Sequence, residues 1–266
     1  MARGKNSRIS RRTRLALVSM VVGVGIWLAL TSVTRVIPPA FLPPPQNIVT
    51  DFFRILWNPY VGNTLVGHTL VSLQIVLGGF FSALLIGIPL GVLMGWFKRI
   101  EAVVDPLFQL LRPIPPLAWI PISLLWFGIG MQSKIFVIWL SAFVPCVINS
   151  YTGIRMTEPL LVKAALGLGV KRQRDLLREV AIPSALPIIL GGARIGLGSA
   201  WMTLVAAELL ASDAGLGYMM QMARRALEPS VIILGMLVIG ILGALMARGL
   251  RALEKRVCPW VKEEEH

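Results

Sequence analysis

The chain has 266 residues, a mean hydropathy of +0.74 and only 15% charged residues, whereas a soluble domain of this length carries about 25%. This composition argues against a soluble protein. The net charge of +13 does not indicate a nucleic-acid partner, because the basic residues lie at the ends of long apolar runs. Two cysteines and two histidines in no ligand-like spacing leave no expected metal site.

The first expected element is a membrane-spanning helix. Residues 1–14 form a basic N-terminus with six basic residues and no acidic one, and residues 15–33 follow without a charge. At about 1.5 Å per residue this run extends about 28 Å, close to the thickness of a bilayer core. A signal peptide also begins with a basic and then an apolar stretch. This apolar core is long for one and no A-x-A site follows it, so we expect an uncleaved span.

Residues 34–68 are expected to form a periplasmic segment before the core domain, residues 69–247. The proline-rich stretch PPAFLPPPQ, residues 38–46, is expected to be extended, because its prolines cannot occupy a helix interior. Residues 48–57 then predict a short amphipathic helix.

Five further spans are predicted in the core domain, at residues 69–97, 102–129, 135–154, 184–211 and 231–247. The second of these contains charged residues and five prolines, so it cannot be one regular helix. Backbone groups freed by such breaks must face protein or a water-filled cavity. The sequence therefore predicts an all-α membrane protein with about six spans.

The distribution of lysine and arginine orients these spans. Nineteen of these residues lie in the N-terminus, at 98–99, in residues 155–182 and in the tail, residues 248–266. Five lie in the segments on the opposite side, and two lie within spans. Cytoplasmic segments carry such an excess of basic residues. Both termini are therefore expected in the cytoplasm.

Small residues recur every four positions in two of the spans, which predicts close helix packing. The two stripes comprise Ala83, Gly87, Gly91 and Gly95, and Gly192, Gly196 and Ala200.

A cytoplasmic loop, residues 155–183, separates the fourth span from the fifth. Thr157 is a candidate N-cap and Pro159 suits a first helical turn. The pattern predicts two short helices with a break at Gly167 and Gly169. The small apolar face of the first helix suits docking into a groove of another protein. The alternative is a loop that packs on itself at the membrane surface.

The residues of this loop resemble a known motif. KAALGLG, residues 163–169, followed by VAIPSALP, is similar to the EAA loop of ATP-binding-cassette importer permeases. FLPPPQ at 41–46, LRPIPPLAWIPISLLWFGIG at 111–130 and GARIGLGSAWMTLVAAELLA at 192–211 narrow the resemblance. Together they resemble the nitrate/sulfonate/taurine permease family, most closely its taurine and sulfonate members.

The resemblance implies a type I importer bundle in the bacterial inner membrane that imports a small anionic solute. It implies two cytoplasmic ATPase subunits, a second permease copy and a periplasmic solute-binding protein as partners, besides membrane lipid. The residues expected to contact the ATPase are Lys163, Ala164, Ala165, Gly167 and Gly169. Lys163 replaces the glutamate of the motif name, and the loop is one residue longer than usual.

The energy source must be a separate chain. No G-x-x-x-x-G-K-[ST] loop occurs to bind nucleotide phosphates, so ATP and Mg²⁺ are expected on the partner ATPase and no cofactor on this chain. Two other classes of function stay open. An ion-coupled transporter or channel would run without ATP. A membrane-embedded enzyme would need a nucleophile, metal or acid–base cluster, for which the sequence offers no candidate.

Ionisable residues within spans are candidates for the translocation path. Arg112 and Arg194 could guide an anion, or could instead reach the cytoplasmic interface with long side chains. Glu208 is a further path candidate, for which pairing with Arg224 or Arg225 is favoured. The segment 212–230 is expected either to close the outer gate or to meet the binding protein, and an interfacial amphipathic helix is the alternative.

Overall fold

A computed structural model describes residues 11–34, 36–210 and 212–260. The rest of the predicted basic N-terminus and of the predicted tail, residues 1–10 and 261–266, lies outside the described residues. Within the described ranges the chain is helical and contains no β-strand, which agrees with the predicted all-α class. Among the described residues, four helices are long and apolar enough to cross a membrane: α3 (Leu65–Trp96), α6 (Met131–Arg155), α9 (Ile182–Leu210) together with the short helix before it, and α11 (Pro229–Val257).

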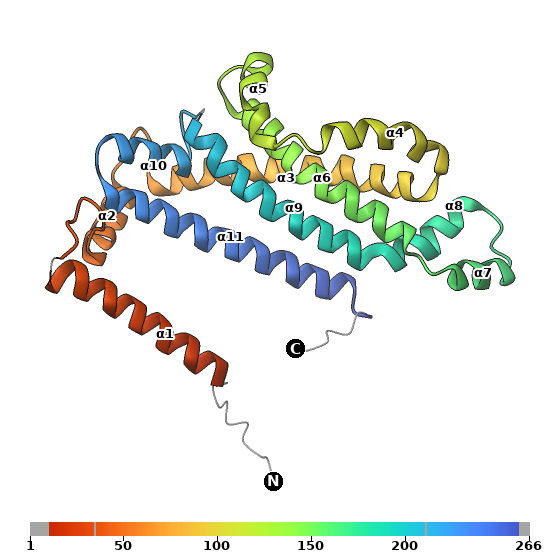
Figure 1. Ribbon diagram of the computed structural model, residues 1–266, viewed down its shortest axis with the longest axis horizontal. Helices are drawn as coiled ribbons and strands as arrows, with labels where there is room; N and C mark the ends of the chain where they lie inside the picture. Colours follow the sequence, from red (N-terminus) through yellow and green to blue (C-terminus); the bar gives the residue numbers. More distant parts are fainter. Residues whose placement is uncertain (1–10, 35, 211, 261–266) are drawn as a thin grey trace, which may run out of the picture.

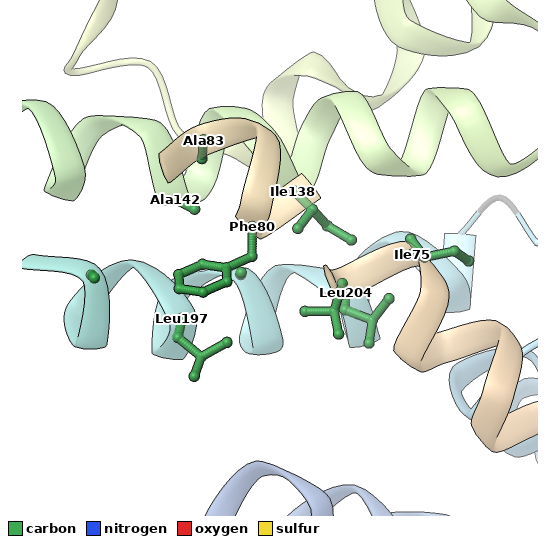
Figure 2. Close-up of a cluster of buried hydrophobic side chains, with 10 residues drawn as sticks. Ile75, Phe80, Ala83, Ile138, Ala142, Leu197 and Leu204 are labelled. Atoms are coloured by element: carbon green, nitrogen blue, oxygen red, sulfur yellow. The ribbon is translucent and has the colours of Figure 1, made fainter. Parts of the chain in front are cut away.

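The helices α3, α6 and α9 form the centre of the bundle (Figure 1). Figure 2 shows Phe80 of α3 between the two other helices, close to Ala142 of α6 and Leu197 of α9, all of them buried. The predicted glycine stripe of α3 faces α6. A Cβ atom at Gly95 would lie 2.8 Å from the Cβ atom of Ile154, and one at Gly87 would lie 3.1 Å from that of Cys146. The stripe therefore allows the close approach of the helices that the sequence predicts.

The predicted broken span consists of α4 (Lys98–Leu111), a 3₁₀ turn η2 (Pro116–Trp119) and α5 (Ile120–Phe127), with an 85° bend between its two helices. The bend coincides with the proline cluster, because prolines cannot donate the helical hydrogen bonds there. The Tyr151 hydroxyl donates to Glu101 Oε1 at 2.5 Å, which ties the start of α4 to α6. Counting the bent pair as one, the described part of the chain has five candidate spans.

A further helix, α1 (Arg11–Leu28), continues into the π-helical turn η1 (Ala29–Val33) and is separated from α11 over most of its length (Figure 1). Val18–Val33 is apolar but shorter than the four long spans. Its end contacts the bundle through Trp27, whose indole nitrogen donates to the Pro43 carbonyl at 3.2 Å.

One end of the bundle, here called the α10 end, carries α2 (Pro45–Trp57) and α10 (Leu216–Arg225) (Figure 1). The prediction of an extended stretch at residues 38–46 is wrong in two places. Residues 38–42 form a turn, in which the Phe41 amide donates to the Pro38 carbonyl at 2.9 Å, and α2 already begins at Pro45. A first helical position accepts proline without losing a hydrogen bond. Asp51 accepts a hydrogen bond from Ser230, so α2 is joined to the start of α11.

The opposite end, the α7 end, carries α7 (Pro159–Gly167) and α8 (Gln173–Leu176) (Figure 1). The prediction of a separate second helix is wrong. The π-helical turn η3 (Leu177–Ala181) connects α8 to α9 without a break, so the helix of the fifth span begins at Gln173 rather than at 184. Buried residues Leu176, Ala181 and Ala185 anchor this extension in the bundle.

Candidate functional site

The candidate site is the helix α7, whose start is set by a proline. Pro159 takes the first helical position, where the missing N–H group costs nothing. The N-cap residue is Glu158 and not the predicted Thr157, and its side chain makes no capping hydrogen bond. The negative charge of Glu158 still complements the positive end of the helix dipole.

The end of α7 is fixed by a Schellman motif. The Val170 amide donates to the Ala165 carbonyl at 3.1 Å, and the Gly169 amide donates to the Leu166 carbonyl at 3.1 Å. Gly169 has a φ of +97°, which only glycine adopts without strain. Gly167, in contrast, is helical, and a Cβ atom there would meet nothing within 4 Å. The break therefore depends on Gly169 and not on both predicted glycines.

The five predicted contact residues lie on different faces of the loop. Ala165 is only 9% exposed, and α7 packs against η3. Lys163, Ala164, Gly167 and Gly169 are exposed. Nothing in the described part of the chain covers these four, so they are available to another protein, whereas Ala165 holds α7 in place.

An open groove of about 740 Å³ lies beside α7. Its walls come from α7, from η3 with the start of α9, and from residues near the end of the described chain. They are mostly apolar, with Leu161, Ala164, Leu168, Val180, Pro183, Pro187 and Trp260, and the polar lining residues are Glu179 and Ser184. The connection that follows α7 is basic and exposed, with Lys171, Arg172 and Arg174. A mostly apolar groove is suited to a protein surface of matching shape, and the exposed basic residues after α7 are suited to acidic charge on a partner.

The two candidate arginines of the translocation path are not brought together. Arg194 Nη1 lies 3.4 Å from Glu254 Oε2 of α11, an ion pair that the sequence analysis did not find. Arg112 is the C-cap residue of α4, exposed at the bend before η2. Among the described residues, no ion pair neutralises the charge of Arg112, so Arg112 is the remaining candidate.

The predicted pairing of Glu208 with Arg224 or Arg225 is wrong. Glu208 is 1% exposed, and its carboxylate accepts hydrogen bonds from Ser72 of α3 and from the Gly217 amide of α10. Arg224 and Arg225 are exposed at the end of α10. The residues of α10 and its N-cap that meet Glu208 are instead Gly215 and Gly217, at the opposite end of the helix from the two arginines.

Three polar residues at the α10 end were missed by the sequence analysis. His68 and Ser72 are fully buried in α3, four residues apart and thus on one face of the helix. Lys134 is 3% exposed and donates to Ser212 Oγ at 2.8 Å. The sequence feature that could have indicated His68 and Ser72 is their i, i+4 spacing at the start of an apolar helix.

Comparison with known proteins supports an assignment to a transporter family. Residues 87–259 match the family described as "Binding-protein-dependent transport system inner membrane component". The chain is 40% identical over 253 residues to the taurine transport system permease protein TauC of Escherichia coli (strain K12), covering 95% of this chain and 91% of that protein. It is 34% identical over 223 residues to the nitrate import permease protein NrtB of Synechocystis, covering 82% and 81%.

The fold is similar to that of a solved transporter. A chain of the MetNI methionine ABC transporter in an inward-facing conformation matches with a TM-score of 0.56 and 21% identity. The match covers 70% of this chain and 95% of that chain.

Proposed function

The chain belongs to the family of binding-protein-dependent transport system inner membrane components, and on this premise we propose that α7 is the helix through which a separate ATPase drives it. The protein is a multi-pass permease subunit of an ABC importer in the inner membrane. Family membership implies an ATPase and a solute-binding protein as partners in general.

One observation carries the assignment of α7. Its two ends are fixed, by Pro159 and by the Schellman motif at Gly169, while four of its five candidate contact residues are exposed. A rigid helix held at one end of a membrane bundle can transmit movement of a partner to the spans. The continuous helix from η3 into α9 offers a direct connection, because α7 packs against η3. An ion-coupled transporter or a channel would need no such contact with an ATPase.

The relatives named for taurine transport and nitrate import support a small anionic solute. A basic side chain on the path attracts such a solute. We infer that Arg112 serves this role, because the charge of Arg194 is paired with Glu254. Glu208 is not part of this proposal, since the start of α10 covers its carboxylate.

Both termini are proposed to be cytoplasmic, with the α7 end of the bundle on the same side. The support is the nineteen-to-five distribution of basic residues between the two sides. A reporter that is active only in the cytoplasm and is fused after Trp260 is therefore expected to be active. A reporter that needs the periplasm is expected to be silent there. This orientation requires six crossings, with the shorter helix α1 as the sixth beside the five candidate spans. The reverse result would contradict it.

Each complex is proposed to contain two permease chains, as a homodimer or with a close relative, and two ATPase subunits. The support is that one chain presents one α7, while ATP hydrolysis in this family uses a pair of ATPase subunits. The native mass of the purified complex is expected to equal two permeases plus two ATPases. A mass that fits one permease with two ATPases would contradict the proposal.

A further inference from the structure

A buried carboxylate joins three helices at the α10 end. Glu208, near the end of α9, accepts hydrogen bonds from Ser72 Oγ of α3, at 2.8 Å to Oε1 and 3.0 Å to Oε2. The Gly217 amide of α10 donates to Oε2 at 2.8 Å. Both partners are donors, and the carboxyl oxygens of Glu208 accept from them.

Side chains of the same cluster also accept hydrogen bonds from the neighbouring backbone amides at the start of α10. The Leu216 amide donates to Ser72 Oγ at 2.9 Å, and the Gly215 amide donates to His68 Nδ1 at 3.2 Å. His68 Nε2 then donates to the Tyr60 carbonyl at 2.8 Å, which fixes the tautomer. Three successive amides that lack helical partners are thus satisfied by side chains of α3 and α9.

The fit of α10 on this cluster leaves no room for a larger residue. A Cβ atom at Gly217 would lie 2.6 Å from Glu208 Cβ and 3.0 Å from the Val205 carbonyl oxygen. Gly215 has a φ of +116° and would direct a Cβ atom onto the Glu208 carboxylate. The start of α10 can therefore take this position only with glycine on both sides of Leu216.

We propose that Glu208, Ser72 and His68 form a lock that ties α10 to the ends of α3 and α9, so that α10 moves with these helices when the importer opens and closes. Glu208 is thereby a positioning residue and not a ligand of the solute. The movement rests on the proposed import function, whereas the lock itself is a property of this chain.

Bundle stability alone does not explain the cluster. Well-packed apolar residues would hold three helices at least as firmly, since burial of a charge has a desolvation cost. Hydrogen bonds depend on distance and direction, so they stabilise one position of α10 and would be broken in any other position. The lock therefore holds α10 in one defined position on the bundle.

The test measures how accessible α10 becomes when the lock is removed. Met220 is 7% exposed on α10, and it is replaced by cysteine in the full-length chain. Native Cys146, which is fully buried in α6, is kept as a reporter of the bundle, and Cys258 is changed to alanine. In membranes, Glu208→Gln or Ser72→Ala is expected to raise the rate of N-ethylmaleimide labelling at position 220 by about tenfold or more. Cys146 is expected to stay unlabelled.

Two further variants distinguish loss of the lock from general loosening of the bundle. Arg225→Gln removes an exposed charge from α10 itself, outside the lock, and is expected to leave labelling at wild-type rates. Gly217→Ala disturbs the lock from the α10 side and is expected to act like Glu208→Gln. Unchanged labelling at position 220 in the Glu208 and Ser72 variants would overturn the proposal, and so would equal labelling of Cys146.

Solute uptake by the same variants then tests the link to transport. Uptake is expected to fall several-fold while the ATPase still copurifies, because the lock lies at the end of the bundle opposite α7 (Figure 1). Wild-type uptake in a chain with exposed α10 would contradict the proposed movement. A failure of the import assignment would leave the labelling result intact, so the two can be told apart.

Discussion

Replacing Ala164 with glutamate is expected to abolish solute uptake while the membrane bundle still folds. Ala164 is exposed on α7 and lines the apolar groove at the α7 end, outside the central helices α3, α6 and α9. A carboxylate buried without a partner in the contact with the ATPase would cost several kcal/mol. The ATPase is therefore expected to dissociate, or its hydrolysis is expected to lose stimulation by the solute.

The measurement compares uptake and ATPase retention in Ala164→Glu with those in Gln173→Glu. Gln173 is exposed in the same loop but lies outside α7, so the same added charge is expected to have little effect. Ala165 is a poorer target, because it is buried and a change there would disturb the packing of α7 itself. Wild-type uptake and retention in Ala164→Glu would favour a loop that only lies at the membrane surface.

Gly169→Val is expected to reduce uptake severely, and Gly167→Ala is expected to reduce it much less, because only Gly169 has a backbone conformation that favours glycine. A valine at a φ of +97° is strained by about 1–3 kcal/mol, which opposes the Schellman motif that ends α7. The helix would then lose its fixed angle to the groove. At Gly167 a Cβ atom meets nothing within 4 Å, and alanine favours the helix.

Uptake assays in membranes with equal amounts of each variant test this pair. Copurification of the ATPase serves as a second measurement. Equal losses in the two variants would mean that both glycines matter for a reason other than backbone conformation. Equal wild-type activity would mean that the angle of α7 is not important for coupling.

The helices of the bundle could be predicted because long uncharged runs have few alternatives in a membrane. The broken span at α4 and α5 was predicted from its prolines, and the glycine stripe of α3 from its spacing. The start of the fifth span was not predicted correctly. Hydropathy locates the bilayer, whereas the helix continues through the charged residues Arg174 and Arg178. Their charges mark the edge of the apolar region and not the end of the helix.

The candidate site could be predicted only in part. The sequence motif located α7, but which of its residues face the bundle depends on η3, whose position no local pattern gives. Glu208 shows the same limit. The first cations that follow it in the sequence are Arg224 and Arg225, yet its hydrogen-bond partner Ser72 lies 136 positions away. Such a contact follows from the packing of α3 against α9, which the sequence does not specify residue by residue.

The most direct measurement of the central claim is cross-linking from α7. In a chain without its two native cysteines, Ala164→Cys carries a short photoreactive maleimide, and the intact complex is irradiated in native membranes. We expect a covalent product between this chain and an ATPase subunit, and none when the probe is placed on an exposed residue of α2, such as Trp57, at the opposite end. Cross-links from position 164 to lipid alone would contradict the assignment of α7 as the helix that couples ATP hydrolysis to transport.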